Sequence, residues 1–266
     1  MTTNDQAAGP FRLDAKHVLI TGAGGAIGGA MVRAFQAAGA VVTAADHTDE
    51  ILAHVDVARK LAFDITDAAA AKNALQSLFR EAGAPDILVN NAARTRAETL
   101  DEVTAEVWER EIAVNLNGAF NVTSPVVAEM VARGSGAIVF ISTVNALAYY
   151  GNPAYSAAKA GMVAYARAIA VEHGRSGVRA NVICPGSVRT HNWTHRFERN
   201  PKLLEDLLPH YPMGRMVLPE EVAQTAVFLS SPAASGITGA VLPVDGGLTA
   251  GNLRFVRDVI EPRSKM

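Results

Sequence analysis

Apolar residues fall into short runs that alternate with longer, alanine-rich segments along most of the chain. The short runs contain mainly valine, isoleucine and leucine at successive positions, a pattern typical of strands that are buried on both faces of a sheet. These runs predict strands at His17–Thr21, Val41–Ala45, Lys60–Phe63, Ile87–Asn90, Ala137–Ile141, Val178–Cys184 and Ala240–Val244.

The longer segments between these runs have the spacing of amphipathic helices. They predict helices at Ala26–Ala38, Ala68–Glu81, Ala105–Val131, Tyr155–Glu172 and Pro219–Leu229. Regular alternation of strand and helix indicates a parallel sheet with helices on both faces, so the predicted fold class is α/β, a Rossmann-type doubly wound sheet. Because no repeat, low-complexity tract or linker interrupts the pattern, we expect a single domain over residues 1–266.

Three segments depart from this alternation. Residues 190–212 follow a predicted strand and are polar and aromatic. Ligands of doubly wound sheets bind beyond the carboxyl ends of the strands, so we expect this segment to be a substrate lid. Residues 1–12 are polar and are expected to form a flexible N-terminus. Residues 251–266 form a C-terminal tail, expected either to reach a neighbouring subunit or to be disordered.

Composition narrows the function classes. The chain of 266 residues has 24 lysines and arginines against 26 aspartates and glutamates, and its pI is about 6.4. This balance argues against a nucleic-acid partner, which usually meets a basic surface. The single cysteine, Cys184, excludes an intrachain disulfide and fits a reducing compartment; on an apolar strand, it is expected in the core. We find no signal-peptide pattern after Met1 and no membrane-spanning apolar run, so the expected location is cytoplasmic.

A glycine-rich turn, Thr21-Gly22-Ala23-Gly24-Gly25-Ala26-Ile27-Gly28, joins the first strand to the first helix. Glycines at such a junction let the backbone turn tightly and approach a pyrophosphate, whose charge the helix N-terminus favours. A plain flexible turn is the alternative, but the position directly between strand and helix favours dinucleotide binding.

The second predicted strand is followed by Asp46 and His47. A carboxylate at this distance from the glycines binds the ribose 2′-hydroxyl of NAD and repels the 2′-phosphate of NADP. No arginine or lysine adjoins Asp46, and the glycine-rich turn holds none, so the sequence predicts NAD. Asp64-Ile65, after the third strand, is expected near the adenine. Asn90–Ala93, after the fourth strand, places small residues where backbone would meet the cofactor.

Tyr155 and Lys159 are four positions apart, so on a helix both side chains lie on one face. A free tyrosine has a pKa of about 10 and is a poor base at neutral pH, whereas a nearby cation favours the phenolate and lowers that pKa. The pair therefore suits a general acid/base that moves a hydroxyl proton while hydride leaves the carbon. Alone, this spacing is common by chance.

Taken together, these motifs resemble those of the classical short-chain dehydrogenase/reductase family over essentially the whole chain. The matching residues are, in order, Thr21–Gly28, Asp46, Asp64, Asn90–Ala93, Asn115, Ser142-Thr143, Tyr155, Lys159, Pro185-Gly186 with Thr190, and Asp245-Gly246-Gly247. The resemblance implies that Tyr155 is the acid/base and that Lys159 holds the nicotinamide ribose and tunes Tyr155. It also implies that Asn115 orders a water that links Lys159 to solvent, and that a serine near position 142 hydrogen-bonds the reacting oxygen.

The motifs and the resemblance together give the expected cofactor-binding set: Gly22, Gly25, Ala26, Ile27, Gly28, Asp46, His47, Asp64, Ile65, Asn91, Ala92, Ala93, Tyr155, Lys159, Val188 and Thr190. Val188 and Thr190 are implied to contact the nicotinamide carboxamide, and no metal site is expected. Two residues depart from the family pattern, since Ala26 and Ala93 stand where glycine is usual. An added methyl costs little at negative φ, so these departures bear on the fit of the cofactor rather than on its binding.

Two hydroxyls compete for the role of assisting Tyr155. Counting back from Tyr155 by the family's usual spacing gives Ser142, whereas counting along the fifth strand from Gly136 gives Thr143, with the next loop one residue short. Successive strand residues face opposite sides, so only one of them can face the reacting oxygen. We favour Ser142, because the Tyr155 spacing selects it and threonine is stiffer at χ1.

The predicted function is NAD-dependent hydride transfer between a secondary alcohol and its ketone, on a small molecule such as a sugar, polyol or hydroxy acid. Polarity of the substrate is suggested by an excess of basic residues in and beside the lid, although solvated charges are also ordinary on a lid helix. The basic residues are Arg189, His191, His195, Arg196, Arg199, Lys202, His210 and Arg215, against Glu198, Glu205 and Asp206.

Two alternatives come from different classes. A 3-oxoacyl-carrier-protein-type reductase resembles the chain but commonly uses NADPH, which Asp46 disfavours. A non-catalytic nucleotide-sensing protein on the same fold is disfavoured because the Tyr155–Lys159 pair is intact. The resemblance further implies a homo-oligomer, a tetramer or dimer, paired through the two long helices. Trp108 is expected to pack within one of them, and Trp193, in the lid, to line the substrate site or to pack.

Overall fold

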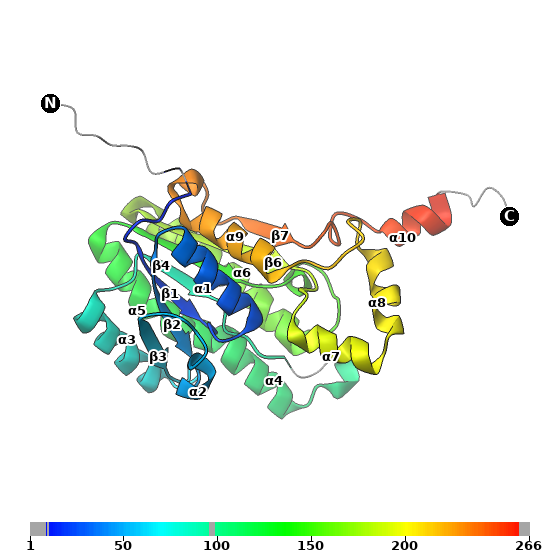
Figure 1. The fold of residues 1–266 in the computed structure, drawn as a ribbon, viewed down its shortest axis with the longest axis horizontal. Coiled ribbons are helices and arrows are strands. Elements are labelled where there is room, and N and C mark those ends of the chain that lie inside the picture. Colours follow the sequence, from blue (N-terminus) through cyan, green and yellow to red (C-terminus); the bar gives the residue numbers. More distant parts are fainter. Residues whose placement is uncertain (1–8, 10, 96–98, 261–266) are drawn as a thin grey trace.

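The structure is a computed structural model that describes residues 9, 11–95 and 99–260. Seven parallel strands form one sheet in the order β3-β2-β1-β4-β5-β6-β7. They are β1 (His17–Thr21), β2 (Val41–Asp46), β3 (Arg59–Ala62), β4 (Ile87–Asn90), β5 (Gly136–Ile141), β6 (Val178–Pro185) and β7 (Val241–Val244). Figure 1 shows helices on both sides of this sheet, so the predicted doubly wound α/β fold is confirmed.

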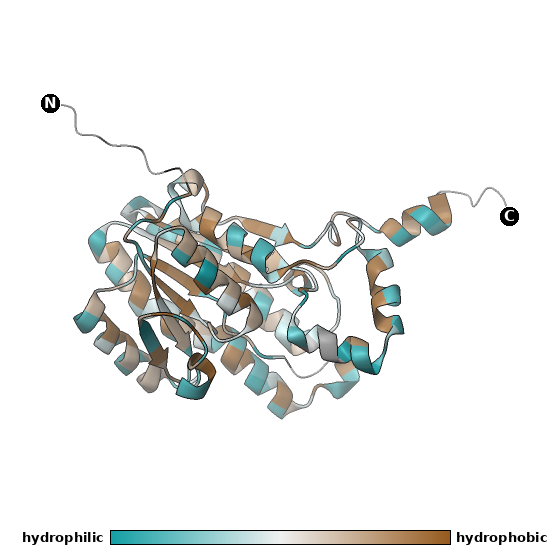
Figure 2. Ribbon diagram, in the orientation of Figure 1, coloured by the Kyte–Doolittle hydropathy of each residue, from teal (hydrophilic) through white to brown (hydrophobic). Residues whose placement is uncertain are grey.

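Two apolar clusters bury the two faces of the sheet. Val18 and Ile20 pack into the cluster under α1 and α9, whereas Leu19 packs into the cluster under α3, α5 and α6. The helices are α1 (Ala26–Ala37), α2 (Asp49–Leu52), α3 (Ala68–Ala82), α4 (Ala105–Ile112), α5 (Gly118–Arg133), α6 (Pro153–His173), α7 (His191–Arg199), α8 (Lys202–Leu207), α9 (Pro219–Ser230) and α10 (Leu253–Phe255). The hydrophobic strands beneath mixed helix surfaces are visible in Figure 2.

The predicted strands and most predicted helices agree with the structure to within two residues. The helix predicted over Ala105–Val131 is instead α4, a π-helical stretch η2 (Ala113–Asn117) and α5 in succession. A π-helical turn widens a helix locally and often marks a functional position. The sequence also did not predict α2, or the short helices α7 and α8 inside the lid.

Three other sequence predictions can be placed. Cys184 is fully buried, so its expected place in the core is confirmed, but Trp108 on α4 is 44% exposed rather than packed away. Residues 1–8 and 10 of the predicted N-terminal segment, and 261–266 of the tail, lie outside the described residues. The described part of the tail forms α10 and η7 (Val256–Ile260), which project from the body near α8 in Figure 1. Within the described ranges, no helix has the length and apolarity to span a bilayer.

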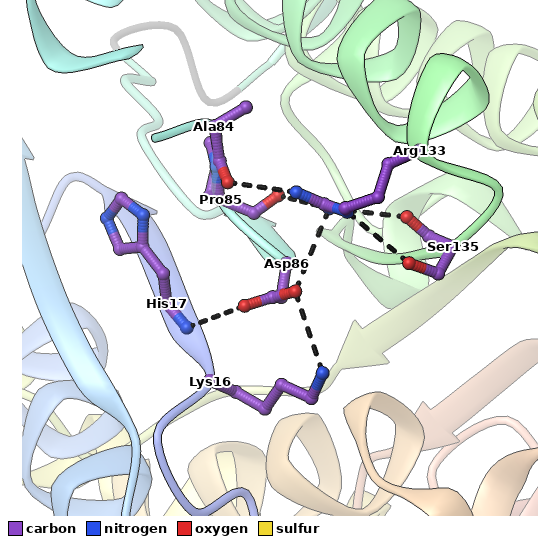
Figure 3. A network of polar contacts seen from close by, with 7 residues as sticks. All are labelled: Lys16, His17, Ala84, Pro85, Asp86, Arg133 and Ser135. Atoms are coloured by element: carbon purple, nitrogen blue, oxygen red, sulfur yellow. Dashed lines mark hydrogen bonds and ion pairs between the residues drawn. The ribbon is translucent and has the colours of Figure 1, made fainter. Parts of the chain in front are cut away.

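A closed polar network joins the amino ends of β1, β4 and β5 (Figure 3). The Asp86 carboxylate accepts from the His17 backbone N–H at 2.9 Å and lies 3.6 Å from Lys16 Nζ. Arg133, at the end of α5, donates to the carbonyls of Ala84 and Pro85, both at 3.0 Å. These bonds satisfy carbonyls and charges at one end of the sheet, so this end contributes to folding.

Candidate active site

The glycine-rich turn packs so closely that side chains would not fit at three of its positions, Gly22, Gly24 and Gly28. Gly22 has φ +65°, and a β-carbon there would lie 2.7 Å from Ala92 Cα. A β-carbon on Gly28 would lie 2.0 Å from the Gly22 carbonyl oxygen. Gly25 caps α1 without a side-chain hydrogen bond, so the first N–H groups of the helix are left for a ligand. This bare backbone at a helix N-terminus fits a pyrophosphate.

A cavity of about 930 Å³ runs from this turn along the carboxyl ends of β1 to β4. Thirteen of the predicted cofactor residues line it: Gly22, Gly25, Ala26, Ile27, Gly28, Asp46, His47, Asp64, Ile65, Asn91, Ala92, Ala93 and Thr190. Ala26 and Ala93 do not have positive φ, so the methyl groups that depart from the family pattern need no strained backbone.

Asp46 ends β2 and closes the turn from the side. Its Oδ2 accepts from the Gly24 backbone N–H at 2.9 Å, and its Oδ1 accepts from the His47 N–H at 2.8 Å. The sequence places no arginine or lysine beside Asp46, but folding brings Arg94 and Arg110 into the lining of the same cavity. The sequence did not predict these two cations near Asp46, because Arg94 follows β4 and Arg110 lies on α4, both distant from Asp46 in the chain.

Asp64, which follows β3, also lines this cavity. Burial raises its pKa, but hydrogen bonds from Thr66 and the charges of His47 and Arg110 outweigh burial, so its pKa lies below the ordinary value. The carboxylate accepts from both the backbone N–H and the hydroxyl of Thr66, at 2.8 and 2.7 Å. Asp64 is therefore held as a charged group.

Asn91 links the loop after β4 to the glycine-rich turn, a role that the sequence did not predict. Its Nδ2 donates to the carbonyls of Thr21 and Gly22 at 3.1 and 3.0 Å. The Thr21 hydroxyl in turn accepts from the backbone N–H groups of Asn91 and Ala92, both at 3.1 Å. The two loops that would contact the cofactor are thus held as one unit.

Tyr155 and Lys159 lie on the first turns of α6, which begins at Pro153 after Asn152. Proline suits the first helical position because its missing N–H would have no partner in the helix. Lys159 is fully buried, and its Nζ donates to the Ile141 carbonyl at 2.7 Å. The ammonium also lies 5.7 Å from the centroid of the Tyr155 ring. The predicted juxtaposition of these two residues is present.

Burial changes the proton affinities of both groups. It lowers the pKa of Lys159 to about 7. It also raises the pKa of Tyr155 above its usual value, and the nearby Glu111 carboxylate adds to the increase. The sequence predicted that the lysine lowers the Tyr155 pKa, whereas in the structure desolvation raises it. An added positive charge near the phenol would oppose this effect.

The two competing hydroxyls follow β5 and have different partners. The Ser142 hydroxyl donates to the Lys159 backbone carbonyl at 3.0 Å and is buried. Thr143 caps the next turn, and its Oγ1 accepts from the Asn145 N–H at 3.3 Å. Both residues line a second cavity, so either hydroxyl could assist Tyr155.

Asn115 lies in η2 and is fully buried. Its Nδ2 donates to the carbonyls of Arg94 and Glu111 at 2.6 and 2.9 Å. Its Oδ1 accepts from the Arg94 backbone N–H at 3.1 Å. The side chain therefore fixes the loop after β4; its amide is committed to backbone, and it lines neither of the two cavities.

The second cavity, of about 660 Å³, contains Tyr155 and Lys159 and extends beneath the lid. It shares Ile27, Asn91, Ala93 and Thr190 with the first cavity, so a dinucleotide in one would meet a substrate in the other. The predicted residues Ser142, Thr143, Val188 and Trp193 line it. The sequence missed Asn145, Tyr150 and Asn152, which reach the cavity from the segment between β5 and α6, and Tyr211, which follows α8.

Comparison with known proteins gives this site a family context. A family profile described as enoyl-(acyl carrier protein) reductase matches residues 22–249. The galactitol 2-dehydrogenase (L-tagatose-forming) of Cereibacter sphaeroides is 39% identical over 90% of this chain and 97% of its own. The 3-oxoacyl-[acyl-carrier-protein] reductase of Thermotoga maritima is 38% identical over 90% of this chain and 99% of its own.

Solved structures of oxidoreductases also superpose closely on this chain. An oxidoreductase of the short-chain dehydrogenase/reductase family from Burkholderia thailandensis superposes with a TM-score of 0.87 at 43% identity, covering 92% of this chain and 97% of the other. A gluconate 5-dehydrogenase from Burkholderia cenocepacia, in complex with NADP and tartrate, superposes with a TM-score of 0.85 at 31% identity, covering 92% and 99%.

Proposed function

Because the chain belongs to the short-chain dehydrogenase/reductase family, we propose that it is an NAD-dependent dehydrogenase of polar secondary alcohols. The chain is an oxidoreductase that interconverts a secondary alcohol and its ketone. The observation that carries the choice of NAD is Asp46, whose carboxylate lines the cofactor cavity and would repel a 2′-phosphate.

Each part of the cavity would hold a different part of the dinucleotide. The Gly22–Gly28 turn would hold the pyrophosphate, Asp46 the adenosine ribose, and Val188 and Thr190 the carboxamide. When bound, the oxidised nicotinamide supplies a hydride acceptor and a positive charge that favours the phenolate of Tyr155. Two observations favour NADP instead: the gluconate 5-dehydrogenase relative is in complex with NADP, and Arg94 and Arg110 line the present cavity. The proposed preference for NAD therefore depends on Asp46.

In the reaction, Tyr155 removes the proton of the substrate hydroxyl while the carbon gives up its hydride, and the C–O bond becomes a carbonyl. Lys159 is held beside the phenol by its bond to the Ile141 carbonyl. Its charged form would stabilise the phenolate. Asn115 acts indirectly here, by fixing the Arg94 loop between the two cavities.

We favour Thr143 over Ser142 as the hydroxyl that assists Tyr155, reversing the preference drawn from the sequence. A hydroxyl has one proton to donate, and that of Ser142 is donated to the Lys159 carbonyl. Thr143 makes only long bonds with Asn145, at 3.3 Å, so it can turn to a substrate oxygen at lower cost.

A polar substrate is supported by relatives that act on sugar alcohols and sugar acids. The second candidate, 3-oxoacyl reduction, is supported by the Thermotoga maritima relative and opposed by Asp46. We also propose a homotetramer in the cytoplasm. Exposed apolar side chains support the assembly: Phe120 on α5 is 52% exposed, and Val171 on α6 is 82% exposed.

The function is tested by following nicotinamide absorbance with NAD or NADP across sugars, polyols, hydroxy acids, aromatic alcohols and, in reverse, a 3-oxoacyl thioester. We expect oxidation of a polar secondary alcohol with NAD. Preferential reduction of the thioester with NADPH would favour the second candidate instead. Absence of turnover with all of them, from protein that binds neither dinucleotide, would contradict an oxidoreductase function.

A further inference from the structure

Tyr211 lies near the end of the lid, yet its side chain is buried in the body of the protein. It follows α8 and the short turn η5 (Leu208–His210), and only 2% of its surface is exposed. The described side chains of α7 and α8 are exposed or half-buried. Tyr211 is therefore the residue through which the lid is anchored to the sheet.

The ring of Tyr211 packs against the backbone of the loops that follow β6 and β7. A β-carbon on Gly186 would lie 3.3 Å from Tyr211 Cε1, and one on Gly246 would lie 3.2 Å from Tyr211 Cδ1. Glycine at both positions leaves the room that the ring occupies. The Gly186 N–H also donates to the Val244 carbonyl at 3.0 Å, which joins the two loops. The phenol is thus held in one place by close packing.

The hydroxyl of Tyr211 fixes the backbone of the loop after β6. Its Oη accepts from the Ser187 N–H at 2.8 Å. The Ser187 carbonyl accepts from the Val217 N–H at 3.1 Å, and the Arg189 N–H donates to the Val217 carbonyl at 2.8 Å. Val188 lies between these bonds. Its position therefore depends on Val217 and on the Tyr211 phenol together.

The same hydrogen bond ties the two ends of the lid together. The lid, residues 190–212, begins three residues after Ser187 and ends one residue after Tyr211. Tyr211, Ser187 and Val188 all line the second cavity. The end of the lid is therefore attached to the loop that we propose for the nicotinamide carboxamide.

Building on the cofactor site proposed above, we infer that Tyr211 is a positioning residue for the nicotinamide half of the dinucleotide. Its phenol fixes the Ser187 N–H and thereby places Val188 and Thr190 against the carboxamide. Hydride transfer is sensitive to small displacements of the reacting groups, so this placement affects the rate. The adenosine half is proposed to bind at Asp46 on β2, which three strands separate from β6, and should not depend on Tyr211.

The test uses ADP-ribose, which has the adenosine, pyrophosphate and second ribose of the cofactor but no nicotinamide. Tyr211→Phe keeps the ring and removes the acceptor of the Ser187 N–H. We expect the loop to move until this N–H finds water, so NADH must bring it back on binding. Calorimetric titration should show NADH affinity lowered by about tenfold, the range for an unpaired backbone donor, and ADP-ribose affinity changed less than about twofold.

Tyr149→Phe is the matched control, because it removes an exposed phenol outside the cavity lining. It should bind both ligands as wild type does. Kinetics give a second readout: in Tyr211→Phe, kcat at saturating NAD and alcohol should fall by about tenfold. The melting temperature without ligand should fall by no more than about 4 °C.

A role of Tyr211 in stability alone would lower the melting temperature and weaken NADH and ADP-ribose equally, which would overturn the inference. Unchanged binding of both ligands would do the same. If wild type binds NADH and oxidises an alcohol while Tyr211→Phe behaves like Tyr149→Phe, the dehydrogenase function stands and the inference about Tyr211 fails. If wild type binds neither NADH nor ADP-ribose, the proposed cofactor site fails, and the inference fails with it.

Discussion

The two ends of the sheet use polar residues in different ways. At the amino ends of β1, β4 and β5, Asp86 pairs with Lys16 and Arg133 and accepts from the His17 N–H, and Arg133 also donates to two backbone carbonyls. At the carboxyl ends, bare backbone and the side chains of Asp46 and Tyr155 face two connected cavities. A polar group whose hydrogen bonds are made within the protein contributes to folding, whereas one that faces a cavity is available to a ligand. Substitutions at the two ends should therefore affect different measurements.

The largest effect is expected at Tyr155. Tyr155→Phe removes the proton-transfer group and keeps the ring, so turnover should fall by about 10²–10⁴-fold, the range for general acid–base catalysis. Dinucleotide affinity and thermal stability should change little. Tyr149→Phe is the control, because Tyr149 is 64% exposed and lies outside the cavity lining. Near-normal turnover of Tyr155→Phe would refute the acid/base role.

The next largest effect is expected where backbone alone forms the cofactor site. In Gly28→Ala the new methyl would collide with the Gly22 carbonyl and displace the turn. Overpacking costs about 1–3 kcal/mol, so NADH affinity should fall by about 10- to 100-fold in a fluorescence titration. Gly29→Ala is the matched control, since its methyl would meet nothing closer than 3.6 Å. Equal affinities of the two variants would show that the turn does not contact the dinucleotide.

A smaller effect should distinguish the two hydroxyls after β5. Thr143→Val keeps the shape of the side chain and removes its hydroxyl, so kcat should fall by about tenfold, and the melting temperature should stay close to that of wild type. Ser142→Ala should lower the melting temperature, because the hydrogen bond that joins Ser142 to the Lys159 carbonyl of α6 is lost, with a smaller loss of kcat. The opposite result, with Ser142→Ala inactive and Thr143→Val active, would restore the assignment drawn from the sequence.

The smallest effect on catalysis is expected at the opposite end of the sheet. Arg133→Met leaves the Ala84 and Pro85 carbonyls without their donor. It should reduce the free energy of unfolding by about 1–2 kcal/mol in urea denaturation, with kcat/KM within about twofold of wild type. Exposed Arg80, on α3, gives the matched Arg80→Met control. A kinetic defect that exceeds the loss of stability would show that the two ends are not independent.

The lining of the first cavity, where we propose that the cofactor binds, could be predicted from the sequence almost residue by residue. Glycine is favoured at Gly22 by its positive φ and at Gly28 by the Gly22 carbonyl six residues earlier, and Asp46 stands at the end of a strand. Such features depend on local conformation, which sequence patterns express well. The strand order and the two buried faces follow from the same apolar pattern.

The substrate half depends on contacts between distant elements, and the sequence did not predict it. The bond from Ser142 to the Lys159 carbonyl requires knowing how α6 packs against β5. Asn152 gave a partial signal, since asparagine between glycine and proline favours a turn and tolerates positive φ. The orientation of Arg196 over Trp193 follows only from the helical spacing of α7, a helix that the sequence did not predict.

The central claim is that the carboxyl end of the sheet is a dinucleotide site in which Asp46 selects NAD. Fluorescence titration of the purified protein with NADH and with NADPH tests it without requiring a substrate. We predict that NADH binds at least about tenfold more tightly than NADPH, and that Asp46→Asn narrows this difference by removing the charge that faces the 2′-position. Equal or tighter binding of NADPH by the wild type, or binding of neither dinucleotide, would contradict the account.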